Sequence, residues 1–424
     1  MSTPFPRKLA TGGNGAEFLV EIALGIDNTA GQGVWAPDLN EALWDEGLWN
    51  GSELYWVDVT SRMILAQFTS GRDRWEQRFR TGAGTFVLDN TDGVFNPDGG
   101  RIGDLRFRPG RWIRVSARIN AEPFISMWVG YIDTIEDVYS EGAGGINARI
   151  HAYDHMGNMV IDNPPALETP VPEELSSDRV ERILDLSDWD PILRDIETGF
   201  FDVQSSDLAG SRLEEVQITA DSEGGAFYVS KAGLLTFRNR DYLESPRSAT
   251  PQFTIGDPSG GGVQVGSAST DWSTQRVSND VRFARRGGTE QRVTDDASIS
   301  LYQRRTFQRL NLENADSTDV LFLANRFLEA FRFDHLRIDS LSTIALDEDS
   351  ARELLEMELA DRVRVTIRTL QDWSYTMEAW INRFTFVVSA DDWDVTMQVD
   401  NVDRTDPFDR TGFDDGFDDE GFGN

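Results

Sequence analysis

Apolar and polar residues alternate through most of the first 150 positions of the chain. Residues 17–24 carry an apolar side chain at every second position, which is the period of a half-buried strand. Gly and Pro residues separate further runs rich in β-branched and aromatic residues, which predict strands at 84–88, 112–119, 125–132 and 147–153. We interpret residues 1–155 as an antiparallel barrel or sandwich.

A tryptophan-rich segment, residues 35–56, interrupts this alternation. Its four tryptophans stand among acids and glycines at Trp35, Trp44, Trp49 and Trp56. Their spacing fits neither a helix face nor a strand, so it predicts a long loop. Large aromatics are costly to leave in water and are enriched at interfaces, so these four are the candidate interface residues. The alternative is a lid that covers its own barrel.

The pattern changes after a proline-rich segment, 162–173, which predicts a linker. Helices are predicted at 179–184 and 213–222, where Ser or Asp residues offer N-caps and Gly224-Gly225 ends the second helix. A hairpin follows, with strands at 226–229 and 234–237. Residues 255–268 predict a Gly-rich loop.

The last part of the chain mixes helical and strand periods. Helical spacing predicts helices at 319–331 and 349–359. Strands are predicted at 280–283, 297–302, 336–346, 361–369, 375–388 and 395–399. Within 361–369, three apolar residues face one way (Val363, Val365, Ile367) and three arginines face the other (Arg362, Arg364, Arg368).

These patterns predict a mainly β protein with an α+β insert, in which two antiparallel β-barrel domains flank a mixed α/β middle region. The predicted division is 1–155 for the first β domain, 156–275 for the middle region, 276–400 for the second β domain with its helices, and 401–424 for a tail. The tail is acidic and repeats Gly-Phe three times, so it cannot bury a core. It could bind calcium or a basic partner, or remain a solvated terminus.

Charge and composition exclude several classes of function. The 424 residues include 40 Lys+Arg and 73 Asp+Glu, a net charge of −33, and such a surface repels nucleic acid and anionic membranes. The absence of Cys excludes disulfides, thiolate metal sites and Cys nucleophiles. No stretch approaches the ~20 apolar residues of a membrane span. The apolar stretch 18–24 is too short for a signal peptide, so we expect no secretion route.

Candidate catalytic and metal-binding motifs are weak throughout the sequence. His151 and His155 are four residues apart in HAYDH, without the HExxH pattern of a zinc enzyme, so we favour structural or surface roles. Residues 89–93 (DNTDG) do not keep the EF-hand frame, which favours an Asx-rich turn. The triple glycine at 260–262 lacks the Lys-Ser/Thr of a P-loop, and a GxSxG elbow is absent. We therefore expect no enzyme activity, no metal and no cofactor.

Several motifs, taken in order, resemble one protein family. Residues 84–133 contain GTFVLDNTDGVFNPDGG, FRPGRWIRVSARI and FISMWVGYID, and WVDVTSR precedes them at 56–62. Residues 213–240 (LEEVQITADSEGGAFYVSKAGLLTFRNR) and 279–302 add a helix–hairpin and a later unit. Together with WDEGLW in the tryptophan-rich segment, they resemble minor tail proteins, or baseplate (tail-tip) hub proteins, of tailed bacteriophages with long non-contractile tails. Gln303 stands where this family often has Gly, so a different turn is expected there.

The resemblance implies a structural role in the phage tail tip. Members of the family form a homotrimer in which two tube-like barrels per chain make a ring that closes or extends the tail tube and conducts DNA. The implied partners are distal tail and tail-tube proteins, the tape measure protein and other minor tail proteins, with DNA only in transit. The implied location is the virion, after assembly in the host cytoplasm. An acidic lumen would let DNA slide without binding. Arg362, Arg364 and Arg368 would then face the lumen, a neighbouring subunit or solvent.

Two other functions compete with the hub. One is a polysaccharide-binding or polysaccharide-degrading receptor-contact protein, whose tryptophan-rich acidic loop would stack on sugar rings. A degrading enzyme needs two carboxyl groups at a defined separation in a cleft. The other is a free receptor-binding tip, which would carry the same loop on its distal surface.

Overall fold

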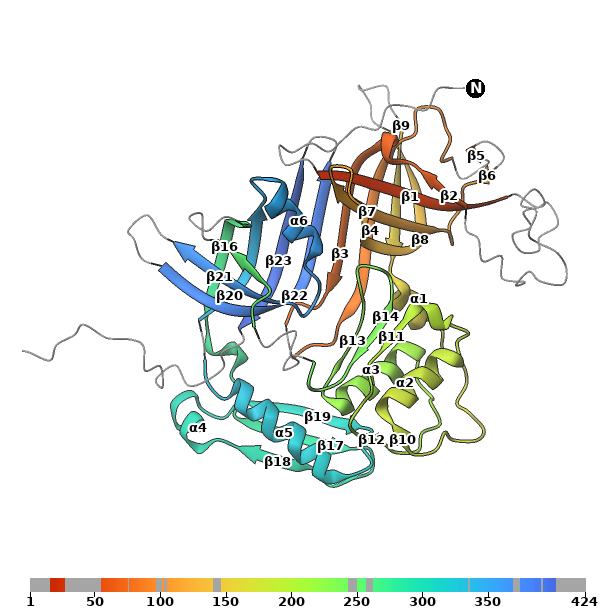
Figure 1. Cartoon of the computed structure of the whole chain (residues 1–424). Helices are drawn as coiled ribbons and strands as arrows, with labels where there is room; N and C mark the ends of the chain where they lie inside the picture. The colour runs from red at the N-terminus through yellow and green to blue at the C-terminus, as the bar shows by residue number, and fades with distance from the viewer. Residues whose placement is uncertain are drawn as a thin grey trace, which may run out of the picture.

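The computed structural model describes residues 16–26, 55–74, 76–96, 101–102, 105–139, 146–242, 250–256, 262–334, 336–368, 374–389 and 392–401. Within these residues the protein is mainly β, with a large antiparallel sheet and few helices, as the alternation predicts. The two β units lie side by side, and two smaller α/β parts lie beneath them in Figure 1. The domain boundaries at residues 155, 275 and 400 remain predictions.

The N-terminal β unit forms one run of neighbouring strands in the order β3-β4-β9-β8-β7-β1. Its strands are β1 (Ala16–Ile26), β2 (Tyr55–Asp58), β3 (Met63–Gly71), β4 (Arg80–Asp89), β5 (Arg101–Ile102), β6 (Leu105–Arg106), β7 (Trp112–Ile119), β8 (Ile125–Tyr139) and β9 (Ile146–Tyr153). The turn that leads into β3 bonds back to β1, because Val59 N donates to Val20 O at 2.9 Å and Val20 N donates to Thr60 Oγ1 at 2.8 Å. The two ends of the run are thereby linked.

The DNTDG turn after β4 is confirmed. Asp89 Oδ1 accepts from Thr91 N at 3.0 Å, which is the Asx-turn bond, and Gly93 has a φ of +73°. The side chain of Asn90 is buried and holds the turn from inside, accepting from Phe95 N at 2.8 Å. These oxygens therefore serve the turn.

The C-terminal β unit has the order β16-β20-β23-β22-β21-β15. Its elements are β15 (Phe253–Ile255), β16 (Gln264–Trp272), β20 (Leu336–Ile344), α6 (Glu348–Glu356), β21 (Arg362–Arg368), β22 (Ser374–Ser389) and β23 (Trp393–Asn401). Gly256 N donates to Val263 O at 2.8 Å, which brings the end of β15 back beside the start of β16. The Gly-rich loop predicted at 255–268 is too long, because β16 begins at Gln264 and pairs with β20.

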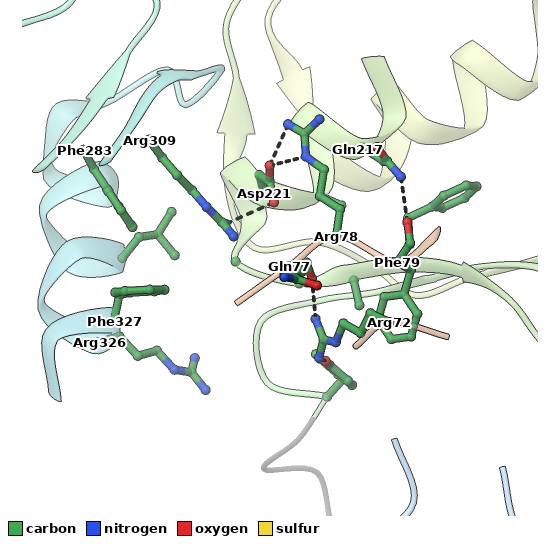
Figure 2. A pocket seen from close by; sticks show the side chains of 17 residues that line it. Arg72, Gln77, Arg78, Phe79, Gln217, Asp221, Phe283, Arg309, Arg326 and Phe327 are labelled. Carbon is green, nitrogen blue, oxygen red and sulfur yellow. Dashed lines mark hydrogen bonds and ion pairs between the residues drawn. The ribbon is translucent and has the colours of Figure 1, made fainter. Parts of the chain in front are cut away.

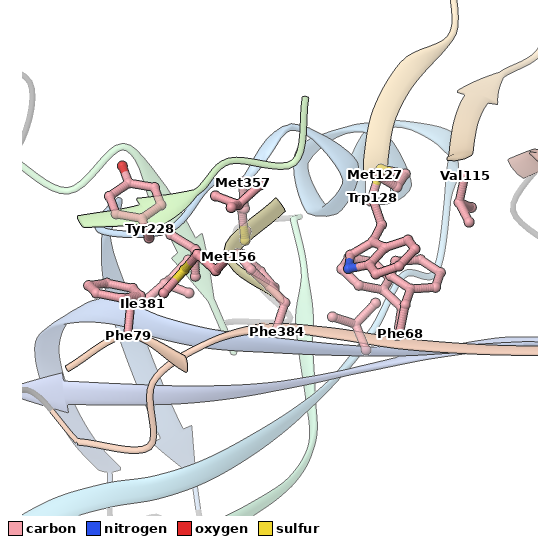
Figure 3. Close-up of a cluster of buried hydrophobic side chains, with 14 of the residues drawn as sticks. Phe68, Phe79, Val115, Met127, Trp128, Met156, Tyr228, Met357, Ile381 and Phe384 are labelled. Carbon is pink, nitrogen blue, oxygen red and sulfur yellow. The ribbon is translucent and has the colours of Figure 1, made fainter. Parts of the chain in front are cut away.

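The two β units share one sheet of 15 strands through β22. This long strand divides one edge between two partners: residues 374–380 pair with β21, and residues 383–389 pair with β3. We call the β3–β22 pairing, with the side chains packed on it, the seam. Phe68 of β3 stacks on Phe386 of β22 with ring centroids 5.1 Å apart. Figure 3 shows Phe68 beneath Trp128, with Phe384 to the left of both.

The middle unit packs three helices beside two small sheets. Its elements are α1 (His155–Ile161), β10 (Glu174–Leu175), α2 (Ser176–Asp185), β11 (Arg194–Ile196), β12 (Asp202–Val203), α3 (Arg212–Glu223), β13 (Ala226–Val229) and β14 (Leu235–Arg238). The predicted helix–hairpin is confirmed: α3 ends at Gly224, whose φ of +72° suits glycine, and β13 pairs with β14. The tip of the hairpin reaches the β units, where Ser126 Oγ donates to Lys231 O at 2.9 Å.

The last unit has a hydrophobic core separate from that of the β units, and Phe201 of the middle unit also contributes to it. Its elements are β17 (Asp280–Arg285), β18 (Gln291–Thr294), α4 (Asp296–Tyr302), β19 (Thr306–Leu312) and α5 (Ser317–Phe331). The strand predicted at 297–302 is wrong, because this segment is α4. Asp295 caps the helix by accepting from Ser298 N at 2.8 Å, and this local bond outweighs the alternating pattern. Gln303 ends α4 with a φ of +63°, a conformation that glycine adopts more easily.

Candidate functional sites

Only one of the four candidate tryptophans lies among the described residues. Trp56 belongs to strand β2 and pairs with Ala23 of β1, so the predicted loop ends earlier than residue 56. The guanidinium of Arg114 lies 4.1 Å from the centre of the Trp56 ring and also donates to Glu21 at 2.7 Å. Strand pairing and this cation–π contact explain why Trp56 is held in the sheet. Trp35, Trp44 and Trp49 lie outside the described residues.

The valines and arginines of β21 lie on opposite faces of the strand, as the alternation predicts. Val363 and Val365 are fully buried, whereas Arg364 and Arg368 on the opposite face are exposed. Arg362 and Arg364 both donate to one carboxylate, Glu378 of β22, and the Arg364 bond is 2.8 Å long. Burial raises the pKa of Glu378, but these hydrogen bonds outweigh it and hold the pKa below its usual value. Sequence reasoning missed Glu378, because the pairing of β21 with β22 brings it there.

The two histidines of HAYDH do not meet at one site. His151 lies on β9 and is partly exposed, whereas His155 begins α1 and is fully buried. His155 lies among aromatic rings, with its centroid 4.7 Å from Trp112 and 5.2 Å from Trp189. Burial lowers the pKa of His155 to about 4, so the ring is neutral at physiological pH. The described part of the chain contains no cluster of three or more metal-ligating side chains.

Buried acids in the described residues are held by arginines and backbone donors. The carboxylate of Asp280 is fully buried, lies 2.7 Å from Arg292 Nε and 3.0 Å from Arg282 Nη2, and accepts from Thr306. Burial raises its pKa, but these bonds outweigh it and the pKa is lowered. Glu313 is buried between Arg179 and Arg286. These groups connect strands and helices and are not open to a substrate.

A pocket opens where the N-terminal β unit, helix α3 and the last unit meet (Figure 2). The space at this pocket is about 730 Å³ when the open solvent at its mouth is included. The residues that line it come from the β3–β4 connection, from α3 and the start of β13, and from β17, β19 and α5. No local motif could have revealed this pocket, because its walls come from segments as far apart as Arg72 and Phe327.

Arginines dominate the polar lining of the pocket. Arg78 and Arg309 share the carboxylate of Asp221, at 2.7 Å and 3.0 Å. Arg72 lies over the Phe79 ring at 4.4 Å and donates to Tyr242 Oη at 3.0 Å. Among the described residues that line the pocket, Asp221 is the only carboxylate, so this part of the lining contains no pair of acids for sugar hydrolysis.

Two solved structures of tail proteins, one of them from a prophage, have a fold similar to that of this chain. The chain resembles the tail protein from Neisseria meningitidis MC58 at a TM-score of 0.55 and 12% identity, covering 90% of this chain and 96% of that one. It also resembles the 43 kDa tail protein of prophage MuSo2 from Shewanella oneidensis at a TM-score of 0.55 and 13% identity, covering 91% and 98%. This chain has the fold of phage tail proteins.

The likeness is visible in structure and not in overall sequence. No protein-family profile matches the chain, and no curated protein sequence matches it. The resemblance that the sequence motifs indicate is therefore confirmed as a shared fold that extends over nearly the whole chain. In the described residues, no helix is long and apolar enough to cross a lipid bilayer.

Proposed function

We propose that this chain is a structural component of a bacteriophage tail, acting as a baseplate hub or minor tail protein at the tail tip. The observation that carries the proposal is the fold, which matches two phage tail proteins over at least 90% of this chain and nearly all of theirs. Because the match extends over nearly the full length of both chains, it cannot be explained by one shared domain within otherwise different proteins. The sequence motifs support the same function independently, because they depend on residue order alone.

The finer proposal is a homotrimer whose two β units per chain form a ring around a channel. Support comes from β22, which joins the two units edge to edge and so fixes their relative position. A rigid pair of β units repeated three times is suited to a closed ring. The net charge of −33 supports a conduit, because an acidic wall repels phosphate and lets DNA pass. The tail tube, the tape measure protein and other minor tail proteins are the proposed neighbours.

We propose two surfaces for these contacts. The tryptophans Trp35, Trp44 and Trp49 remain proposed interface residues, with Trp56 holding the start of β2 on the sheet. The exposed face of β21, with Arg364 and Arg368, is proposed to face the channel or a neighbouring subunit. We propose no catalytic role for the chain. We further propose that it assembles into tails in the host cytoplasm and then remains in the virion.

Electron microscopy of phage particles that carry an epitope-tagged copy of the chain tests this function. We expect the antibody label at the end of the tail opposite the capsid, and untagged particles serve as the control. A reconstruction of that end should show threefold symmetry with six similar β units in one ring. Label on the capsid, or purified particles that lack the chain, would refute the proposal. Another symmetry would refute the trimer alone.

An activity assay separates the hub from the polysaccharide-degrading alternative. Purified chain should release no sugar from host cell-wall glycan or capsule. Release that is lost when a single carboxylate is changed to its amide would overturn the non-enzymatic assignment. Release that persists in every such variant would point to a contaminating hydrolase and leave the assignment in place.

A further inference from the structure

Exposed aliphatic side chains gather at one end of the middle unit. Helix α1 ends with Val160 and Ile161, and the segment after α2 carries Leu186 and Ile192. Ile161 and Ile192 are 74% and 77% exposed, more than any other large apolar side chain among the described residues. Val160 and Leu186 are nearly half exposed. Single apolar residues on a surface are ordinary, whereas several together mark a contact with another molecule.

Hydrogen bonds hold these segments beside one another. Ser187 follows Leu186 and donates from Oγ to Asp162 Oδ2 at 2.8 Å. Asp162 in turn follows the last residue of α1, so the ends of α1 and α2 are adjacent. The turn that carries Ile192 is closed by Arg194, which donates to Asp185 Oδ1 at 2.6 Å. Both helices lie on the side of the molecule away from the C-terminal β unit (Figure 1). We call Val160, Ile161, Leu186 and Ile192 the aliphatic surface.

The charge beside the aliphatic surface is negative. Four carboxylates belong to the same segments: Asp162, Asp185, Asp188 and Asp190. The last three are exposed, and Asp162 is partly exposed. Two arginines lie near these acids, Arg194 beside Asp185 and Arg212 beside Asp162, but the side chains of both arginines are almost fully buried. The charge that reaches solvent here is therefore mostly carboxylate.

This charge disfavours two occupants of the aliphatic surface and favours a third. A second copy of the chain also carries a net charge of −33, so like charges would meet. Segments that bind a membrane surface carry Lys and Arg around their apolar side chains, whereas carboxylates flank this one. A protein segment that combines aliphatic side chains with Lys or Arg complements both the apolar residues and the charge.

We propose that the aliphatic surface docks another protein, through a segment that carries aliphatic side chains with Lys or Arg beside them. Burial of the two exposed isoleucines supplies most of the affinity. The carboxylates attract the basic side chains and raise the on-rate, so salt should weaken binding without abolishing it. This proposal does not depend on the tail function, because it concerns a surface of the isolated chain.

Binding of synthetic peptides to the full-length chain tests the proposal. The probe is a fluorescein-labelled helical peptide with leucines on one face and lysines on the other, and fluorescence anisotropy measures its affinity. Ile161→Ser combined with Ile192→Ser should lower this affinity at least about tenfold, since both side chains lose their burial in the complex. The same peptide with serine for leucine should bind about tenfold more weakly, and the peptide with glutamate for lysine should not bind.

Leu301→Ser combined with Leu346→Ser is the matched control, because both leucines are exposed and lie outside the middle unit. It should leave the affinity unchanged. Neither pair of substitutions should change the melting temperature, since the replaced side chains already contact water. A photoreactive leucine in the probe should crosslink to the chain within 158–162 or 184–194, mapped by mass spectrometry.

A change of one carboxylate provides a second arm that removes no apolar contact. Asp188 has a φ of +55°, which asparagine tolerates, so Asp188→Asn removes the charge and keeps the turn. It should weaken binding of the lysine peptide about two- to threefold at low salt. Asp349→Asn, at an exposed acid of α6, removes the same charge elsewhere and should have no effect. If the Ile161→Ser and Ile192→Ser chain fails to fold, this arm and the crosslinks still decide.

Failure of the lysine peptide to bind, equal losses in the two serine pairs, or crosslinks elsewhere would overturn the proposal. Sedimentation of the chain alone tests the second copy: a dimer that Ile161→Ser and Ile192→Ser abolish would show that the chain covers its own surface. Binding to phosphatidylcholine vesicles that the same substitutions abolish would assign the surface to a membrane. Either result would replace the proposed protein partner.

Discussion

The two β units meet each other along paired strands and apolar rings, whereas the middle unit meets them through apolar packing, such as Tyr228 on Phe79, together with buried polar and charged groups. At the seam, β3 and β22 exchange backbone hydrogen bonds from Gly71 to Leu65, and Phe68 stacks on Phe386. At the contact with the middle unit, Lys231 of the hairpin tip donates from Nζ to Leu355 O at 3.1 Å, above the ring of Phe384. His155 lies among the rings of Trp112, Tyr131 and Trp189.

This difference indicates how each contact responds to its surroundings. Apolar burial and backbone pairing at the seam do not involve a proton, and water weakens the partly exposed ion pair of Arg383 with Asp73 at its end, so pH and salt should affect the seam little. Burial lowers the pKa of Lys231 to about 8 and that of His155 to about 4, so the contact with the middle unit contains titratable groups. We expect the sheet to remain intact under conditions that loosen the middle unit.

The largest effect should come from removing an aromatic ring at the seam. Phe386→Ala deletes a side chain that is 1% exposed and leaves a cavity against Phe68 and Phe384. The free energy of unfolding should fall by about 3–5 kcal/mol, measured by urea denaturation. Leu301→Ala, at a side chain that is 58% exposed, should change it by less than about 0.5 kcal/mol. Similar losses in both variants would mean that the seam adds no special stability.

The second effect concerns the backbone at the seam. Gly71 has a φ of +122°, and an added Cβ would lie 2.1 Å from Asn382 O. Gly71→Ala should therefore cost about 2–3 kcal/mol, through strain and displacement of β22. Gly110 also has a positive φ, +80°, but no atom lies within 4 Å of the added Cβ. Gly110→Ala should lower the free energy of unfolding by about 1 kcal/mol, through the strain of the positive φ alone. Thermal melting of both variants therefore shows how much of the Gly71→Ala effect comes from the close approach of β22.

The third effect is a pH dependence at the middle unit. The unfolded chain protonates His155 near its ordinary pKa of 6.5, whereas the folded chain protonates it only near 4. Because the unfolded chain takes up this proton first, His155 lowers the free energy of unfolding by roughly 1–3 kcal/mol as pH drops from 6.5 to 4. Its neighbour Asp154 acts in the opposite direction, because burial raises the pKa of Asp154 to about 7 and protonation then favours the folded chain.

The difference in stability between His155→Phe and the unmodified chain isolates the histidine. As pH falls from 7 to 4.5, the unmodified chain should lose more stability than His155→Phe. Above pH 7 the difference between the two should be constant, and this range is the internal control. Urea unfolding at several pH values measures it. A difference that does not change with pH would show that water reaches the ring in the folded protein.

The smallest effect should come from the ion pairs of the pocket. Asp221 pairs with Arg78 and Arg309, whose side chains are 40% and 24% exposed, so water screens both pairs. Asp221→Asn should lower the free energy of unfolding by no more than about 1 kcal/mol and should reduce its dependence on salt. A loss as large as that of Phe386→Ala would erase the contrast between the two kinds of contact.

The spacing of apolar residues along short segments of the sequence accounts for the helices and strands that could be predicted. The alternation in residues 17–24 matches β1, and the run of turn residues between 229 and 234 matches the β13–β14 hairpin. Helix α5 follows from its 3.6-residue apolar spacing. The error at 297–302 has the same origin, because a short segment can fit both periods and the cap at Asp295 decides between them.

Long-range pairing accounts for what could not be predicted. The division of β22 between β21 and β3 at Asn382 depends on a partner more than 300 residues away. Glu378 became the partner of Arg362 and Arg364 only through that register. The pocket likewise collects Arg72, Asp221 and Arg309 from three units of the fold.

The sequence by itself determined the β-rich class, most strands and helices, the acidic character and the motif order that resembles phage tail proteins. These properties depend on side-chain period and composition, which a linear chain displays directly. The tertiary structure alone decided that the two β units form one sheet, that His155 is neutral within aromatic rings, and that four arginines from distant segments line one pocket. Those outcomes depend on which distant segments bury their surfaces against each other, and burial is a property of the folded chain.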